Sequence, residues 1–160
     1  MVFIAVAVLT ACNEKHEGRS MSKEETAAHL DSLKSELLQT DIEFSQLSEQ
    51  KGRNAAFTEY ADSGATMLRP YSMPVVGKNK LMELFSSHPD TSFTLTWVPI
   101  YVDVARSGEM GYTYGTYSLE RDGKASGGTY CTLWKKRHKE NKWKFVLDTG
   151  NEGVKPEDRE

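Results

Sequence analysis

Hydrophobic residues recur at helical spacing in the first part of the chain and form one apolar stripe. Ser22 followed by Glu25 matches a capping box, which predicts where a helix begins, and Gly52 predicts where it ends. The sequence therefore predicts one long amphipathic helix between these two signals. Its stripe consists of Leu30, Leu33, Leu37, Phe44 and Leu47.

Two shorter helices and an early strand are predicted next. Asn54 is expected to cap a second helix, and the residues after this helix predict a short strand over 65–69 that ends at Pro70. Gly77 leads into a third helix, which closes before Pro89. The apolar residues of this third helix are Leu81, Met82, Leu84 and Phe85.

After Pro89 the pattern changes from helical spacing to the alternation of a β-sheet. Four strands are predicted, and the last two flank a charged connector, which is typical of an antiparallel hairpin with a solvated tip. Such a sheet needs the helices to cover its apolar face, so the order of elements predicts an α+β fold with helices on one face. The predicted strands are 92–105, 110–119, 129–134 and 143–147.

The N-terminal residues have a different character. Residues 2–11 are apolar or small, and the chain becomes strongly polar directly after Cys12. Such a run is typical of a signal-peptide core and is too short to span a membrane, and Leu9-Thr10-Ala11-Cys12 resembles the bacterial lipoprotein motif, whose cysteine is lipidated. A buried N-terminal strand with a structural cysteine is the alternative. The expected organisation is a lipoprotein signal peptide over 1–12, a flexible tether over 13–21, one α+β domain over 22–152 and a polar tail over 153–160.

The composition is that of an ordinary globular domain. The 160 residues suffice for one domain, and a net charge of −3 provides no field of one sign, so a nucleic-acid partner is not expected. The 4 histidines are scattered without metal-binding spacing, and the sequence predicts neither a metal site nor another cofactor. Membrane contact is expected through the lipid anchor only. Cys131 is predicted to be a small buried hydrophobe.

Short motifs from about residue 37 to about residue 151 occur in a characteristic order. They are Asp41-Ile42-Glu43-Phe44-Ser45, Tyr60-Ala61-Asp62, Val76-Gly77, Leu95-Thr96-Trp97-Val98-Pro99, Gly115-Thr116-Tyr117, Gly128-Thr129-Tyr130, Leu133-Trp134 and Asp148-Thr149-Gly150. Each motif is weak, but the ordered set is fairly specific. On these residues the chain resembles the nuclear transport factor 2-like superfamily, which includes ketosteroid isomerase and SnoaL-like cyclases, and within it a bacterial branch of unknown function.

The resemblance implies a cone-shaped barrel, in which a strongly curved antiparallel sheet wraps around the long first helix, with two further short helices. In that superfamily the cone usually encloses a ligand-binding pocket, and dimers often form through the sheet. A homodimer is therefore one expectation for this chain. The fold does not determine a reaction, because enzymes, binding modules and scaffolds share it.

Two carboxylates are the candidates for chemistry. Asp41 falls inside the apolar stripe of the first helix, where a low dielectric raises a carboxyl pKa toward the range of a general base. The structural alternative pairs Asp41 with a strand backbone or with Arg69. Asp148 lies opposite Phe145 by strict alternation, unless a bulge redirects it toward the pocket as a second carboxylate. Its ordinary alternative is to stabilise the following turn.

Aromatic residues and one arginine are the candidates for binding a ligand. Core packing is the ordinary alternative for the aromatic residues, and an exposed surface charge is the alternative for the arginine. Tyrosine and tryptophan bring a polar group that needs a partner when it is buried, which suits them to a mixed pocket. The candidate residues are Tyr60, Arg69, Tyr71, Trp97, Tyr114, Tyr130 and Trp134.

Three functions are compatible with these observations. The favoured one is a lipid-anchored domain of the bacterial cell envelope, with a pocket for a small, partly apolar molecule and a binding or accessory role. The second is an isomerase, dehydratase or cyclase with Asp41 as general base and a tyrosine or Asp148 as the polarising donor. The third is a scaffold whose sheet binds a partner or a second copy. The first is favoured because the sequence contains no complete catalytic set.

Overall fold

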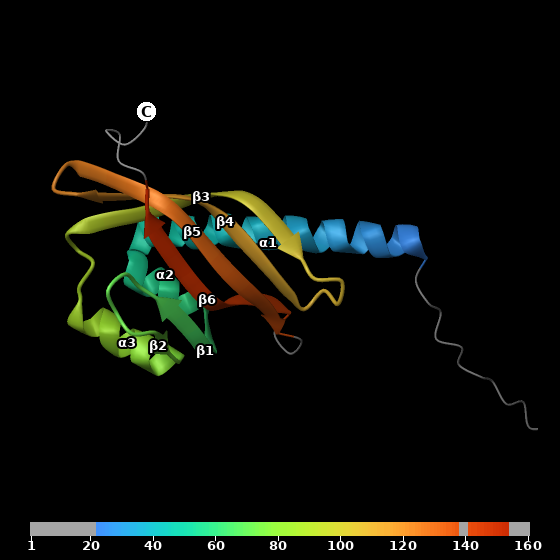
Figure 1. The fold of residues 1–160 in the computed structure, drawn as a ribbon, viewed down its shortest axis with the longest axis horizontal. Coiled ribbons are helices and arrows are strands. Elements are labelled where there is room, and N and C mark those ends of the chain that lie inside the picture. The colour runs from blue at the N-terminus through green and yellow to red at the C-terminus, as the bar shows by residue number, and fades with distance from the viewer. Residues whose placement is uncertain (1–21, 138–140, 154–160) are drawn as a thin grey trace, which may run out of the picture.

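The computed structural model describes residues 22–137 and 141–153. The expected signal peptide with Cys12, the tether and the tail beyond residue 153 lie outside the described residues, which form three helices and one six-stranded sheet (Figure 1). None of the described helices is long and apolar enough to cross a membrane. The elements are α1 (Lys23–Lys51), α2 (Arg53–Tyr60), β1 (Ala61–Leu68), β2 (Val75–Val76), α3 (Lys78–Ser87), β3 (Phe93–Val104), β4 (Met110–Arg121), β5 (Lys124–Arg137) and β6 (Lys142–Glu152).

Helix α1 has the predicted bounds. The Glu25 backbone N–H donates to Ser22 Oγ at 3.1 Å, and the Ser22 N–H donates to Glu25 Oε2 at 2.8 Å, so the predicted capping box is present. Gly52 follows the helix with a φ of 87°, a conformation that glycine adopts without strain. The N-terminal end of α1 projects beyond the sheet (Figure 1).

Helix α2 begins differently from the prediction. Gly52 precedes α2, and Asn54 lies inside the helix without capping it. The Asn54 side chain donates instead to the carbonyl oxygens of Phe85 and His88, at 3.1 Å each, and so ties α2 to the end of α3. Strand β1 starts at Ala61, earlier than predicted, because an irregularity in its pairing accommodates the residues between Ala61 and Thr66.

The strands follow the order β2-β1-β6-β5-β4-β3. Strands β3 to β6 form the predicted antiparallel meander. Strand β1 pairs with β6 in parallel, a pairing that the sequence did not predict. At two places neighbouring strands approach so closely that only glycine fits. A Cβ at Gly115 would overlap the carbonyl oxygen of Val98, and a Cβ at Gly128 would overlap the carbonyl oxygen of Asn151. The predicted α+β cone is confirmed.

Phe44 of α1 is the centre of an aromatic core. Its ring centroid lies 4.6 Å from that of Trp97 on β3 and 4.7 Å from that of Phe57 on α2. Phe145 on β6 stacks on it at 5.9 Å. This cluster fixes α1 and α2 against the inner face of the sheet, so the side chains next to it are held in defined positions. The fully buried side chains of the core include Leu37, Phe44, Leu81, Trp134 and Phe145.

Candidate functional site

A hydrogen-bonded network surrounds Asp41, which α1 carries into the core with no exposed surface. Trp97 Nε1 donates to Asp41 Oδ1 at 2.8 Å, and the Tyr130 hydroxyl donates to Asp41 Oδ2 at 2.7 Å. Burial raises the pKa of Asp41 above its ordinary value, while the hydrogen bonds from Tyr130, Trp97 and Thr113 act against that rise. Thr113 in turn accepts a bond of 2.9 Å from Trp134 Nε1. The carboxyl group of Asp41 is therefore satisfied by side chains alone.

The inner face of the sheet, α2 and the end of β1 line a cavity of about 250 Å³ that opens to the surface. Its wall is mostly apolar, and Trp97 and Tyr130 form part of it. Asp41 is not one of the described residues that line this cavity, because Trp97 and Tyr130 lie between its carboxyl group and the cavity. Asp41 thus fixes the positions of two wall residues by hydrogen bonds on the side away from the cavity. The apolar wall includes Phe57, Met67, Leu95, Trp97 and Leu119.

Asp148 is the candidate carboxyl group that lines the cavity. Leu133 of β5 faces Leu147 of β6, but Trp134 faces Phe145, so β6 contains a bulge at the residue between them. Because this bulge adds one residue to the alternation, Asp148 shares the inner face with Phe145. The redirecting bulge that a second pocket carboxylate requires is present.

One hydroxyl group holds the Asp148 carboxyl group. Thr132 Oγ1, itself buried, donates to Asp148 Oδ2 at 2.8 Å. Burial raises the pKa of Asp148 to about 7, with the Thr132 bond lowering it and the nearby charge of Asp41 adding to the rise. Asp148 consequently changes its protonation state near neutral pH, which a carboxyl group in water does not do.

Four of the predicted site residues meet at the cavity: Arg69, Trp97, Tyr130 and Asp148. Arg69 does not pair with Asp41, so that structural alternative is wrong; the actual partners of Asp41 are side-chain donors from the sheet. Sequence reasoning missed Arg53, Leu119 and Glu152, which also line the cavity.

Two aromatic candidates belong to the core and not to the cavity wall. Trp134 is fully buried, and its ring meets that of Phe44 edge-on at 5.9 Å. Tyr60 also packs on Phe44, at 4.8 Å between ring centroids, and meets the Trp134 ring edge-on at 6.4 Å. Neither ring lines the cavity, and the ordinary alternative of core packing describes both. Residue type alone could not separate them from Trp97, since all these rings crowd around one phenylalanine.

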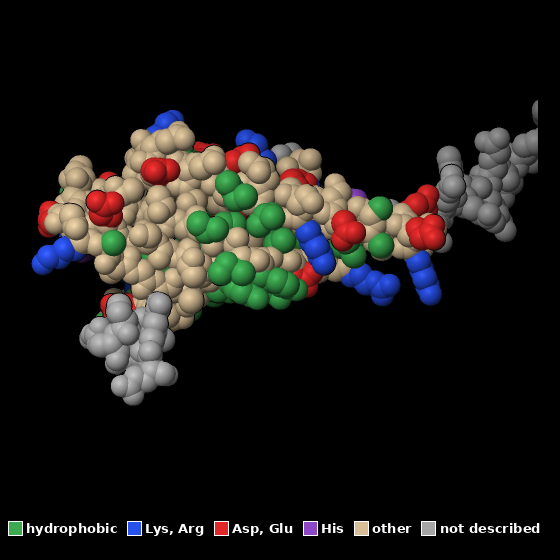
Figure 2. Space-filling view, turned by 90° about the horizontal axis from the view of Figure 1, so that it is seen from above, with side chains coloured by type: hydrophobic (Ala, Val, Ile, Leu, Met, Phe, Trp, Pro, Cys, Tyr) green, Lys and Arg blue, Asp and Glu red, His purple; other side chains and the backbone are tan. Residues whose placement is uncertain are grey.

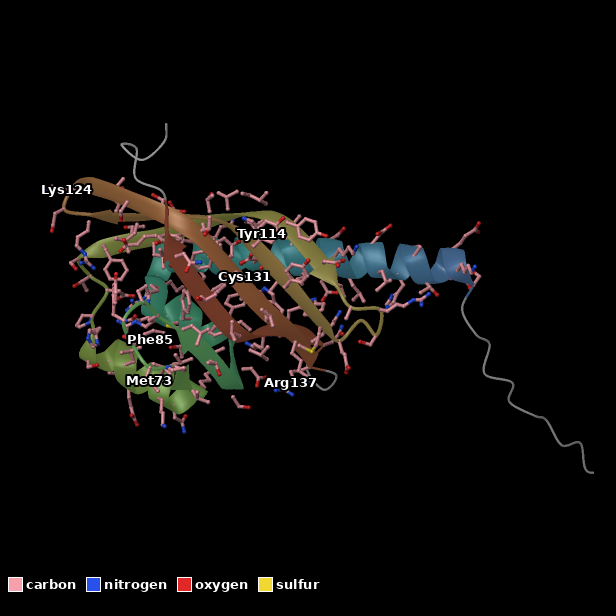
Figure 3. The ribbon with its side chains drawn as sticks, in the orientation of Figure 1. Met73, Phe85, Tyr114, Lys124, Cys131 and Arg137 are labelled. Carbon is pink, nitrogen blue, oxygen red and sulfur yellow. The ribbon has the colours of Figure 1, made fainter. Side chains whose placement is uncertain are left out.

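Two further aromatic candidates lie on the surface. Tyr71 is fully exposed in the loop between β1 and β2, at a positive φ of 56°. Tyr114 points to the outer face of β4, where its ring stacks on Tyr101 at 5.1 Å. In the view of Figure 3, Tyr114 lies at the upper surface, far from Met73 on the loop beside α3. Cys131, opposite Tyr114 on β5, was predicted to be a small buried hydrophobe and is half-buried.

The solved structures most useful for comparison share this fold. The chain was compared with protein-family models and with curated proteins, and neither comparison found a match. A nuclear transport factor 2-like protein of unknown function from Pseudomonas putida aligns with a TM-score of 0.63 at 9% identity, covering 81% of this chain and 93% of that one.

Two further solved structures agree with this similarity. A nuclear transport factor 2-like protein with a cystatin-like fold from Novosphingobium aromaticivorans gives a TM-score of 0.61 at 14% identity, over 81% of this chain and 88% of that one. A ketosteroid isomerase-like protein from Erwinia carotovora atroseptica gives 0.54 at 14% identity, over 84% and 100%. These likenesses confirm the fold that the sequence motifs implied, and at such identities they show the fold alone.

Proposed function

We propose that this protein binds a small, partly apolar molecule in its cavity, as a lipid-anchored domain of the bacterial cell envelope. The observation that supports binding is the cavity of about 250 Å³, which is walled mainly by apolar side chains and carries Asp148 as a polar group. Ligand sites of proteins have this composition, with a few polar groups that orient the ligand. The volume suits a molecule of small size.

Binding is favoured over catalysis by Asp41. A general base must come within hydrogen-bond reach of the proton that it removes. Asp41 lies behind Trp97 and Tyr130, and its two oxygens already accept their hydrogen bonds. Tyr130 directs its proton to Asp41 and not into the cavity, so this geometry supplies no polarising donor from that tyrosine. The arrangement therefore supports a positioning role for Asp41.

A second function is favoured by Asp148 alone. Its carboxyl group lies on the cavity wall with a pKa of about 7, a value that suits acid–base catalysis at neutral pH. The alternative proposal is an isomerase or lyase that uses Asp148 as its acid and base. It predicts turnover that the substitution Asp148→Asn abolishes, whereas a binding protein retains its ligand in that variant.

Binding is tested by a thermal-shift screen of the unaltered chain and of a variant in which a larger side chain fills part of the cavity. The full chain, extracted in detergent, is screened by thermal shift against a panel of small amphipathic molecules. Gly150 lines the cavity, and a Cβ there would meet Tyr117 and Thr129 at ordinary contact distances of 3.5 and 3.6 Å. A side chain can therefore begin at this position without overlap, and the valine of Gly150→Val is expected to extend into ligand space. Its expected result is an unchanged or higher melting temperature without any ligand-induced shift, because valine favours strands. Thr129→Val, on an exposed position, is the matched control.

The result that contradicts the binding proposal is equally direct. It fails if no molecule of the panel shifts the melting temperature of the unaltered chain. It also fails if Gly150→Val responds to the same molecules as strongly as Thr129→Val does.

The lipid anchor is proposed from the sequence around Cys12. The chain contains 2 cysteines, so Cys131→Ser serves as the matched control for Cys12→Ser. Cys12→Ser is expected to move the protein from the membrane fraction to the soluble fraction and to remove the mass of the acyl chains. Membrane association of Cys12→Ser equal to that of Cys131→Ser contradicts the anchor.

A homodimer through the sheet is proposed as the assembly. Figure 2 shows apolar side chains gathered in the middle of one face. The large apolar side chains exposed on the adjacent strands β3 and β4 are Val98, Ile100, Tyr101, Met110, Tyr112 and Tyr114. Contiguous apolar surface of this kind is typical of an interface between proteins.

A further inference from the structure

Three arginines lie close together, and two of them line the cavity. Arg53 and Arg69 line it directly. Burial lowers the pKa of Arg53, the carboxylate of Asp90 raises it, and the charges of Arg69 and Arg121 lower it. Arg69 and Arg121 therefore lie close enough to Arg53 to repel it. Like charges at such separations are costly unless an anion lies among them.

Arg53 is held in a fixed position. Its guanidinium carbon lies 5.0 Å from the ring centroid of Phe93 and 5.2 Å from that of Phe85. Its Nε and Nη2 donate to Asn54 Oδ1 at 3.0 and 2.6 Å. Arg121 lies over the same Phe93 ring, at 5.1 Å. A cation that is positioned in advance loses little entropy when it binds an anion.

Arg69 is available for a ligand. It is exposed at the end of β1, directly on the cavity rim. Within residues 22–137 and 141–153, its guanidinium group makes no ion pair or hydrogen bond. Arginine presents a planar fork of donors that matches the oxygens of a carboxylate or phosphate. The free fork of Arg69 and the fixed charge of Arg53 thus adjoin one opening.

The charge balance at the rim favours a ligand with a single negative charge. Asp90 lies beside Arg53 and accepts the Asn54 backbone N–H at 2.6 Å. Glu152 lines the cavity as well. Asp148, which also lines the cavity and has a pKa of about 7, is mostly protonated below that pH. There the carboxylates of Asp90 and Glu152 offset two of the three arginine charges, so one positive charge remains. A monoanion neutralises this charge, whereas a dianionic phosphate ester would exceed it.

The apolar wall determines what the negative group is attached to. Leu95, Leu119 and Trp97 line the same cavity as the two arginines, so an anion bound at the rim is next to apolar surface. We propose that the ligand is a small carboxylic acid, bound with its carboxylate at Arg53 and Arg69 and its apolar body inside the cavity. This inference rests on the proposed function, since it names the chemical class of ligand for the same cavity.

The test compares carboxylates with their uncharged amides. Calorimetry measures the binding of two carboxylates, phenylacetate and hexanoate, to the full chain. It also measures the binding of the matching amides, phenylacetamide and hexanamide. The carboxylates are expected to bind more tightly than the amides. Arg69→Gln is expected to weaken carboxylate binding about tenfold and amide binding less than about twofold, as the loss of one charge-assisted hydrogen bond implies. Arg106→Gln, an exposed arginine in the turn between β3 and β4, is the matched control and should leave both affinities unchanged.

Several results overturn the inference and separate it from the proposed function. Amides that bind as tightly as carboxylates, or an Arg69→Gln variant with unchanged carboxylate affinity, refute the carboxylate assignment while binding itself stands. Phenyl phosphate binding more tightly than phenylacetate also refutes it, in favour of a dianion. If carboxylates and amides all fail to bind the unaltered chain, the inference falls for these probes. A panel that also gives no thermal shift means that the proposed function has failed with it.

Discussion

Replacing Asp148 with asparagine is predicted to stabilise the protein at pH 8 and to reduce the pH dependence of its stability. In the folded chain burial raises the pKa of Asp148 to about 7, against an ordinary value of 3.8. Between these two pH values the folded state keeps a proton that the unfolded state has lost. Asp148 therefore lowers the free energy of unfolding as the pH rises from about 4 to about 7. Above about pH 7 its contribution to the free energy of unfolding no longer changes.

The magnitude follows from the two pKa values. Their difference corresponds to roughly 4 kcal/mol at about 1.36 kcal/mol per pH unit. Water that reaches the carboxyl group through the cavity reduces this value, so we expect a gain of about 2–4 kcal/mol for Asp148→Asn at pH 8. Asparagine keeps the shape of aspartate and can still accept the hydrogen bond from Thr132, so the substitution removes the charge and little else.

Urea unfolding at pH 4, 6 and 8 measures this effect. The free energy of unfolding of Asp148→Asn should exceed that of the unaltered chain at pH 8 and approach it at pH 4. Some pH dependence should remain, because burial raises the pKa of Asp41 as well. Glu152→Gln removes an exposed carboxylate from the same cavity and is the matched control. An Asp148→Asn variant that is no more stable than the unaltered chain at pH 8 refutes the reasoning.

Three further predictions concern Asp41, Gly115 and Tyr114. Asp41→Ala should lower the free energy of unfolding, measured with urea, by about 3–5 kcal/mol, because it leaves buried donors without an acceptor. Asp41→Asn should lower the free energy of unfolding less, and equal losses in the two variants would contradict this account. Gly115→Ala should cost about 3 kcal/mol or more, since its Cβ overlaps a backbone oxygen, whereas Gly123→Ala, in open space at a positive φ, should cost about 1 kcal/mol. Tyr114→Lys should convert the proposed dimer to a monomer in sedimentation without changing the melting temperature of the monomer, and a variant that sediments as the unaltered chain does would exclude that interface.

Local signals in the sequence predicted the helices and the meander. Helix α1 was bounded correctly because Ser22, Glu25 and Gly52 lie next to the turns that they specify. The parallel pairing of β1 with β6 was not predictable in this way, because it joins strands that are far apart in sequence and leaves no mark on either one. The early start of β1 depends on the same pairing.

The candidate site was predictable in part. The apolar stripe of α1 correctly indicated that Asp41 faces the core. Its partners Trp97 and Tyr130 lie 56 and 89 residues away, so only the folded structure brings them together. The direction of Asp148 depends on a bulge that no glycine or proline marks at that point in β6. The outward direction of Tyr114 was not predictable from alternation, because the polar Thr113 is buried and the aromatic residues on either side of it are exposed.

Native mass spectrometry tests the central claim, that the cavity is a ligand site, most directly. The full chain and its Gly150→Val variant are expressed in the same bacterial host, extracted in parallel and released from detergent in the instrument. The account predicts an adduct of constant small mass on the unaltered chain and none on Gly150→Val. An adduct of equal abundance on both proteins, or no adduct on the unaltered chain even after incubation with the small-molecule panel, would contradict it.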